Sequence, residues 1–153
     1  MTRAKKDIEM KVVIEKADSK EEEQALIKAF ELTGDIKSAA ELLEGDSGNL
    51  PVTLDGRVYI IKHSTIYYIE SVDKKTFVYT KDSCYESKYR LYELETILLG
   101  MFLRCSKATI LNLKKVRSVN SEMSGRMVAT LLNGESIVIS RGYVKEVKGR
   151  LGI

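Results

Sequence analysis

The residues that most often carry catalysis or metal binding are few in this chain. The sequence of 153 residues contains one histidine, His63, and two cysteines, Cys84 and Cys105. A structural zinc site requires four ligands with paired spacing, and these three residues are far apart. We expect His63 to lie in a solvated loop and both cysteines to be reduced and buried. The sequence therefore predicts no metal site, although spacing alone leaves a Cys–His nucleophile pair open.

Short motifs of common enzyme families are absent as well. The chain contains no GxxxxGK[ST], GxGxxG, GxSxG or HExxH sequence. These motifs hold phosphates, dinucleotides, a nucleophilic serine and a catalytic zinc, respectively. We therefore predict that the protein is not an enzyme and uses no cofactor.

Positive charge is concentrated toward the C-terminus. Residues 1–55 contain 8 Lys/Arg against 13 Asp/Glu, whereas residues 56–153 contain 17 against 9. In the last 53 residues there are 10 against 3. Because clustered positive charge attracts polyanions, the C-terminal part is expected to bind a phosphate-rich partner. The alternative is a solvated basic face without a ligand.

The first fifty residues predict a small α/β extension. The β-branched run at 10–16 predicts a strand, and the carboxylates after Lys20 predict a helix that ends at Gly34. Asp35 is expected to cap a second short helix. The turn-rich stretch that ends at Pro51 predicts a boundary between an extension over 1–50 and a domain over 51–153.

From residue 52 onward, alternating apolar and polar residues predict a mainly β domain. Two short helices are expected, over residues 91–99 and 141–151. Asn133-Gly134 is the strongest hairpin signal, because both residues tolerate positive φ. The expected strands cover residues 58–61, 66–70, 76–80, 83–87, 109–113, 116–119, 126–132 and 136–140.

Three motifs in this part resemble those of the LytTR family of DNA-binding domains. Residues 102–113, FLRCSKATILNL, are similar to the family pattern F-x-R-x-x-x-S/T-x-x-V/I-N. The Asn133-Gly134 hairpin and the sequence Ser140-Arg141-Gly142-Tyr143 follow in the family's order. The resemblance covers the chain from about Leu50 to the C-terminus. It implies an elongated β-sheet domain with short helices.

The resemblance also implies a function and its partners. LytTR domains read double-stranded DNA with loops that enter successive major grooves, at promoters with repeated sites bound by two copies. The chain is similar to stand-alone LytTR transcriptional regulators of Gram-positive bacteria, with an extension that does not look like a receiver domain. This implies a cytoplasmic response-regulator-like protein that forms a homodimer at least on DNA. It also implies a membrane-bound inhibitory partner, with dimerisation or regulatory contacts for residues 1–50.

Carried over onto this chain, the resemblance places DNA contacts in three segments. In residues 73–76, Lys75 or Thr76 takes the base-contacting position. In residues 104–107 that position is Lys107, and in residues 140–143 Arg141 matches the groove-reading arginine. The complete set of predicted contacts is Lys74, Lys75, Thr76, Arg104, Ser106, Lys107, Ser140, Arg141, Tyr143 and Lys145.

Side-chain chemistry separates base reading from positioning. An arginine can donate two hydrogen bonds to N7 and O6 of guanine, which makes Arg141 the best candidate for sequence readout. Lysines such as Lys74 and Lys145 are better suited to phosphates, and hydroxyls such as that of Ser106 can donate to phosphate oxygens.

Several alternatives stay open from sequence alone. Arg104 can equally be a structural arginine, paired with Glu93 or Glu95, and Asn112 is expected to be a buried hydrogen bonder. The many tyrosines fit sheet packing better than a stacking platform for single strands. Alternative functions are a protein-interaction module with a basic β surface and a non-specific nucleic-acid binder.

Overall fold

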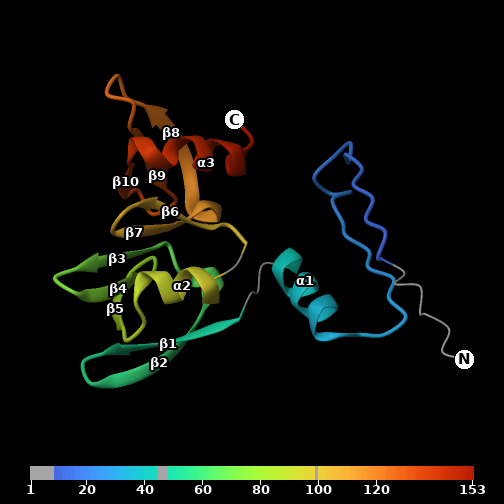
Figure 1. The fold of residues 1–153 in the computed structure, drawn as a ribbon, viewed down its shortest axis with the longest axis horizontal. Helices are drawn as coiled ribbons and strands as arrows, with labels where there is room; N and C mark the ends of the chain where they lie inside the picture. The colour runs from blue at the N-terminus through green and yellow to red at the C-terminus, as the bar shows by residue number, and fades with distance from the viewer. Residues whose placement is uncertain (1–8, 45–47, 99) are drawn as a thin grey trace, which may run out of the picture.

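The computed structural model describes residues 9–44, 48–98 and 100–153. Within these ranges, strands form two antiparallel sheets, accompanied by three α-helices and two short 3-10 turns (Figure 1). The strands are β1 (Asn49–Leu54), β2 (Arg57–Lys62), β3 (Tyr68–Val72), β4 (Lys75–Tyr79), β5 (Cys84–Ser87), β6 (Phe102–Ser106), β7 (Thr109–Asn112), β8 (Val116–Ser121), β9 (Met127–Leu131) and β10 (Ser136–Ile139). The helices are α1 (Gly34–Glu44), α2 (Leu91–Ile97) and α3 (Arg141–Leu151), and the 3-10 turns are η1 (His63–Thr65) and η2 (Leu113–Lys115).

The smaller sheet lies beside the β7-β6 end of the larger sheet, and α2 and α3 each pack against one of the two hydrophobic cores. The larger sheet has the strand order β2-β1-β5-β4-β3-β7-β6, and the smaller has the order β10-β9-β8. Helix α2 contacts β3, β6 and β7, whereas α3 contacts β6. Figure 1 shows the smaller sheet and α3 above β6 and β7.

Strand β7 separates two hydrophobic cores because successive side chains of a strand point to opposite faces. Ile110 belongs to the first core and Leu111, its neighbour in the chain, belongs to the second. The first core lies between the larger sheet and α2 and contains Leu50, Val52, Ile66, Ile69, Val78, Leu91, Leu94, Leu98 and Ile110. The second core lies against the smaller sheet and α3 and contains Tyr67, Cys105, Leu111, Leu113, Met127, Ala129, Leu131, Ile139 and Val147.

The prediction of a mainly β fold with short helices is confirmed, and each strand expected after residue 52 has a counterpart. Two strands were missed. Strand β1 begins inside the expected boundary and contains Pro51. A proline is tolerated in this strand because β1 pairs with β5 only at Thr53, and a residue without an N–H fits where a strand has a free side. Strand β6 extends through the segment around Arg104 that was expected to be a loop.

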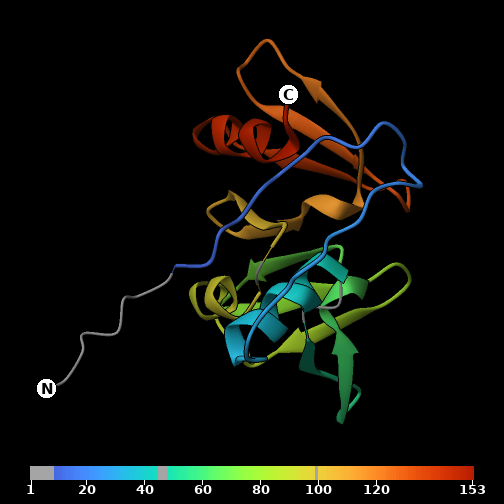
Figure 2. The ribbon, with the colours of Figure 1, turned by 90° about the vertical axis from the view of Figure 1, so that its right-hand side faces the viewer.

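The extension differs from the predicted α/β unit. Residues 9–33 contain neither the expected strand nor the expected first helix, and only α1 forms. Among the described residues no strand pairs with 10–16, and an unpaired strand is not stable alone. An isolated helix of this length requires an apolar face to bury, yet Leu26 and Phe30 are exposed. Figures 1 and 2 show this segment running outside the two sheets.

Histidine 63 is buried rather than solvated, with only 3% of its surface exposed. It begins η1, and its backbone N–H donates to the carbonyl of Gly48 at 2.8 Å. The hydrogen bond ties η1 to the residues before β1.

None of the described helices combines the length and apolar character that a membrane crossing requires.

The two cysteines differ in environment, so we expect only one to react in the folded protein. Cys84 is exposed, whereas Cys105 is buried in the second core. Burial raises the pKa of the Cys105 thiol to about 12, which removes the reactive thiolate at ordinary pH. Mass spectrometry after alkylation near pH 8 (roughly the ordinary thiol pKa) should show one modified cysteine in the native protein and two in denaturant. Double modification of the native protein would contradict this assignment.

Candidate nucleic-acid interface

The three segments predicted to contact DNA lie on one side of the molecule. The turn between β3 and β4, the turn between β6 and β7, and the beginning of α3 all point to the left in Figure 1. Two backbone hydrogen bonds connect them. The N–H of Ser71 in β3 donates to the carbonyl of Ala108 at 2.8 Å, and the N–H of Ser140 donates to the carbonyl of Cys105 at 2.8 Å. Segments far apart in the sequence are therefore held in a fixed order along this side.

The turn between β3 and β4 presents two lysines. Asp73 and Lys74 have φ angles of 50° and 65°, the positive values of a tight hairpin turn. The guanidinium of Arg90 donates to the carbonyl of Lys74 at 3.3 Å and supports this conformation. Lys74 and Lys75 are exposed, but Thr76 is 3% exposed in β4. Thr76 is therefore not accessible for a base contact, which leaves the lysines.

The second segment is shorter than expected, because most of it belongs to β6. The Nη1 atom of Arg104 donates to the carbonyl of Lys107 at 2.6 Å, and its Nε atom lies 2.9 Å from Oε1 of Glu95. The Ser106 hydroxyl accepts a hydrogen bond from the N–H of Ala108 at 3.3 Å. Arg104 is therefore the structural arginine that the sequence offered as an alternative to a DNA contact. Its ion-pair partner is Glu95. Lys107, at the turn itself, is exposed.

The third segment is the start of a helix, not a loop between strands. Ser140 is the N-cap of α3, and Arg141 is its exposed first residue. The N–H of Tyr143 donates to the carbonyl of Ser140 at 2.9 Å. The half-buried side chain of Tyr143 packs against the second core. Lys145 follows Arg141 by one helical turn and is also exposed. The helix N-terminus adds partial positive charge beside Arg141.

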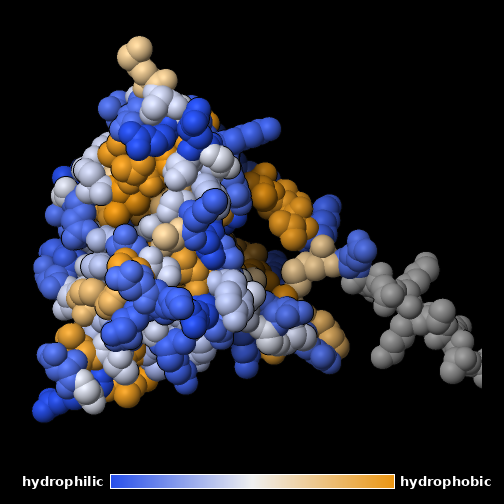
Figure 3. All heavy atoms as spheres, turned by 60° about the vertical axis from the view of Figure 1, so that its left-hand side comes forward, coloured by the Kyte–Doolittle hydropathy of each residue, from blue (hydrophilic) through white to orange (hydrophobic). Residues whose placement is uncertain are grey.

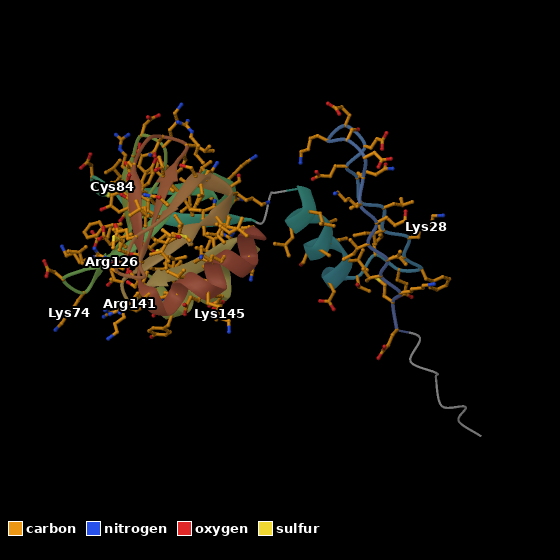
Figure 4. The ribbon with its side chains drawn as sticks, turned by 90° about the horizontal axis from the view of Figure 1, so that it is seen from above. Lys28, Lys74, Cys84, Arg126, Arg141 and Lys145 are labelled. Atoms are coloured by element: carbon orange, nitrogen blue, oxygen red, sulfur yellow. The ribbon has the colours of Figure 1, made fainter. Side chains whose placement is uncertain are left out.

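Two further views show how these side chains are distributed. In the view from above, Lys74, Arg126 and Arg141 project toward the same side of the β unit, and Lys145 lies farther along α3 (Figure 4). Lys28, on the extension, lies far from them in this view. Figure 3 brings this side of the molecule forward and shows hydrophilic side chains over most of it, with apolar side chains scattered between. The surface suits a solvated, charged partner better than an apolar one.

The polar and aromatic residues of the interior confirm two structural interpretations. Asn112 is 2% exposed, and its Nδ2 atom donates to the carbonyl of Ile66 at 2.8 Å. Tyr68 and Tyr79 stack on each other, with ring centroids 4.4 Å apart. Burial raises the pKa of the Tyr79 hydroxyl to about 12, and the interaction with the Cys84 thiol also raises it. Paired rings within the sheet leave less surface for stacking on nucleobases.

Sequence reasoning missed one residue beside the candidate contacts. Gly125, in the loop between β8 and β9, lies directly against the side chain of Arg141. Nothing in the local sequence signals this contact, since the two residues belong to different elements. Among the described residues, no three His, Cys, Asp or Glu side chains are grouped closely enough to hold a metal ion.

The fold and this surface define a mainly β domain whose exposed basic side chains come from two hairpin turns and a helix start. The sequence model of the LytTr DNA-binding domain family matches residues 56–152, and the chain belongs to this family. A LytTr DNA-binding domain of a putative methyl-accepting/DNA response regulator from Bacillus cereus has the same fold. Its TM-score is 0.66 at 24% identity, over 69% of this chain and 98% of that one.

Two curated relatives are similar to the same part of the chain. The sensory transduction protein LytT of Enterococcus faecalis is 28% identical over 68% of this chain and 43% of its own length. The chain thus spans less than half of that relative. An uncharacterized HTH-type transcriptional regulator of Staphylococcus aureus is 31% identical over 65% of this chain and 68% of its own length. In the described part of this chain, strands separate every pair of consecutive α-helices, so no helix-turn-helix unit is formed there.

Proposed function

We propose that the protein is a sequence-specific transcriptional regulator that reads the major groove of double-stranded DNA with these three segments. The observation that carries the proposal is their convergence on one side, fixed by the hydrogen bonds of Ser71 and Ser140. The family supports a DNA-binding regulator. The assigned role is binding, with no reaction and no cofactor, and DNA as the target places the protein in the cytoplasm.

Each exposed side chain receives a role from its chemistry. Arg141 reads guanine through two hydrogen bonds, Lys75 and Lys107 contact base edges, and Lys74 and Lys145 contact phosphates. Ser106, Ser140 and Tyr143 are half-buried, lie next to or close to these cations in the sequence, and supply neutral hydrogen bonds to phosphate oxygens. Arg104 holds the turn of Lys107, and Thr76 has no contact in the proposal.

The proposal includes a second copy and a regulatory partner. Repeated promoter sites would be occupied by two copies, which forms a homodimer at least on DNA. Residues 1–50 would serve dimerisation or regulatory contacts, including those with a membrane-bound inhibitory protein. The domain over 51–153 would bind DNA, and its first strand begins at Asn49.

A titration against duplexes from the protein's own upstream region tests the proposal. Each neutralised phosphate contributes about −0.9 to the slope of log K against log salt, so Lys74 and Lys145 in each of two bound copies give a slope near −3.6. Raising salt from about 50 to 200 mM should therefore weaken binding about 150-fold. A scrambled duplex is the control and should bind more weakly at both salt concentrations. Equal, weak binding to both duplexes would contradict sequence-specific recognition and favour the non-specific alternative.

A further inference from the structure

The loop between β8 and β9, residues 122–126, is closed by its own polar contacts. The backbone N–H of Glu122 donates to the carbonyl of Arg126 at 2.9 Å. The two side chains also pair, with Nη2 of Arg126 3.1 Å from Oε2 of Glu122, and the Ser124 hydroxyl donates to the same oxygen at 3.2 Å. These contacts give the loop a defined shape next to the beginning of α3.

Gly125 meets two separate demands in this loop. Its φ angle is +89°, a conformation that residues with a Cβ adopt at a cost. A Cβ at this position would also lie 2.6 Å from Cδ and 3.0 Å from Cγ of Arg141. The aliphatic stem of Arg141 thus lies against the bare Cα of Gly125, in space that any side chain would take.

We propose that Gly125 is a positioning residue for base readout, with the loop acting as a seat that orients Arg141. An exposed arginine has several rotatable bonds, and binding must restrict them. Packing the stem against Gly125 restricts them before DNA arrives, which lowers the entropic cost of a two-hydrogen-bond contact. The inference rests on the proposed function, because it concerns the residue assigned to read guanine.

A second glycine of the smaller sheet provides a matched control. Gly134, in the hairpin between β9 and β10, also has a φ of +89°, but a Cβ there would meet nothing within 4 Å. The Gly125→Ala and Gly134→Ala variants therefore both place a Cβ at the same positive φ. Only Gly125→Ala displaces Arg141, so the difference between the two variants measures the effect of the contact between Gly125 and Arg141.

The test measures the ratio of affinities for target and scrambled duplexes. Loss of a bidentate contact lowers this ratio by about 5- to 150-fold, and Gly125→Ala should lower it by at most that amount. Gly134→Ala should leave the ratio unchanged. In an Arg141→Ala background the clashing atoms are gone, so adding Gly125→Ala should change nothing. A preserved ratio in Gly125→Ala, or an equal loss in both backgrounds, would overturn the seat.

A measurement without DNA separates this inference from the proposed function. The Nε–H resonance of Arg141, assigned with an Arg141→Lys variant, should shift in Gly125→Ala and stay in place in Gly134→Ala. If the resonance shifts while Arg141→Ala retains full discrimination, the seat exists and the readout role is wrong. An unchanged resonance in Gly125→Ala would refute the seat, whatever the DNA measurements show.

Discussion

The Arg141→Ala variant is expected to lose about 1–3 kcal/mol of discrimination between target and scrambled duplexes, the value of one bidentate guanine contact. Arg141 is exposed at the first position of α3, and the partial positive charge of the helix N-terminus favours an approaching phosphate backbone. Its guanidinium can donate two hydrogen bonds in one plane, which no lysine can reproduce. Non-specific affinity should change little, because the lysines remain.

Binding titrations of target and scrambled duplexes at one fixed salt concentration measure this discrimination. Lys74→Gln is the matched control, because it removes a charge from the same side while keeping a similar side-chain length. It should weaken both duplexes alike and lower the magnitude of the salt slope by about 1 for each bound copy. If Arg141→Ala keeps the preference for the target duplex, the assignment of sequence readout to Arg141 is wrong.

The Leu111→Ala variant should lower the free energy of unfolding by about 2–5 kcal/mol, the usual cost of a large cavity in a packed core. Leu111 is 0% exposed. It lies in β7 opposite Tyr68 of β3 and Leu103 of β6, so paired strands flank it on both sides. Its side chain belongs to the second core, where the residues around the cavity have little freedom to relax.

Urea unfolding followed by circular dichroism provides the measurement. Leu132→Ala serves as the control, because that leucine follows β9 and is 45% exposed. Its substitution should change the free energy of unfolding by about 0.5 kcal/mol or less. A loss below about 1 kcal/mol in Leu111→Ala would mean that β7 is not enclosed by the second core.

Local patterns were sufficient for most of the fold, whereas the candidate contacts came from the resemblance to the LytTR family. Strands after residue 52 followed from alternation, and the hairpins followed from their turn residues, because both signals act over a few neighbouring positions. The same local logic failed in residues 9–33. There the sequence favours a strand and a helix, but the described residues provide no partner that would bury their apolar side chains.

Contacts between distant segments required the tertiary structure. The sequence by itself determined that the protein is mainly β and that its second part is basic, and its resemblance to the LytTR family made Lys107 and Arg141 candidate contacts. Only the fold decided that Thr76 is buried and that Arg104 is engaged internally. It also placed Gly125 against Arg141. The reason is physical: strand alternation and turn propensity depend on neighbours in the chain, whereas burial and seating depend on which elements pack together.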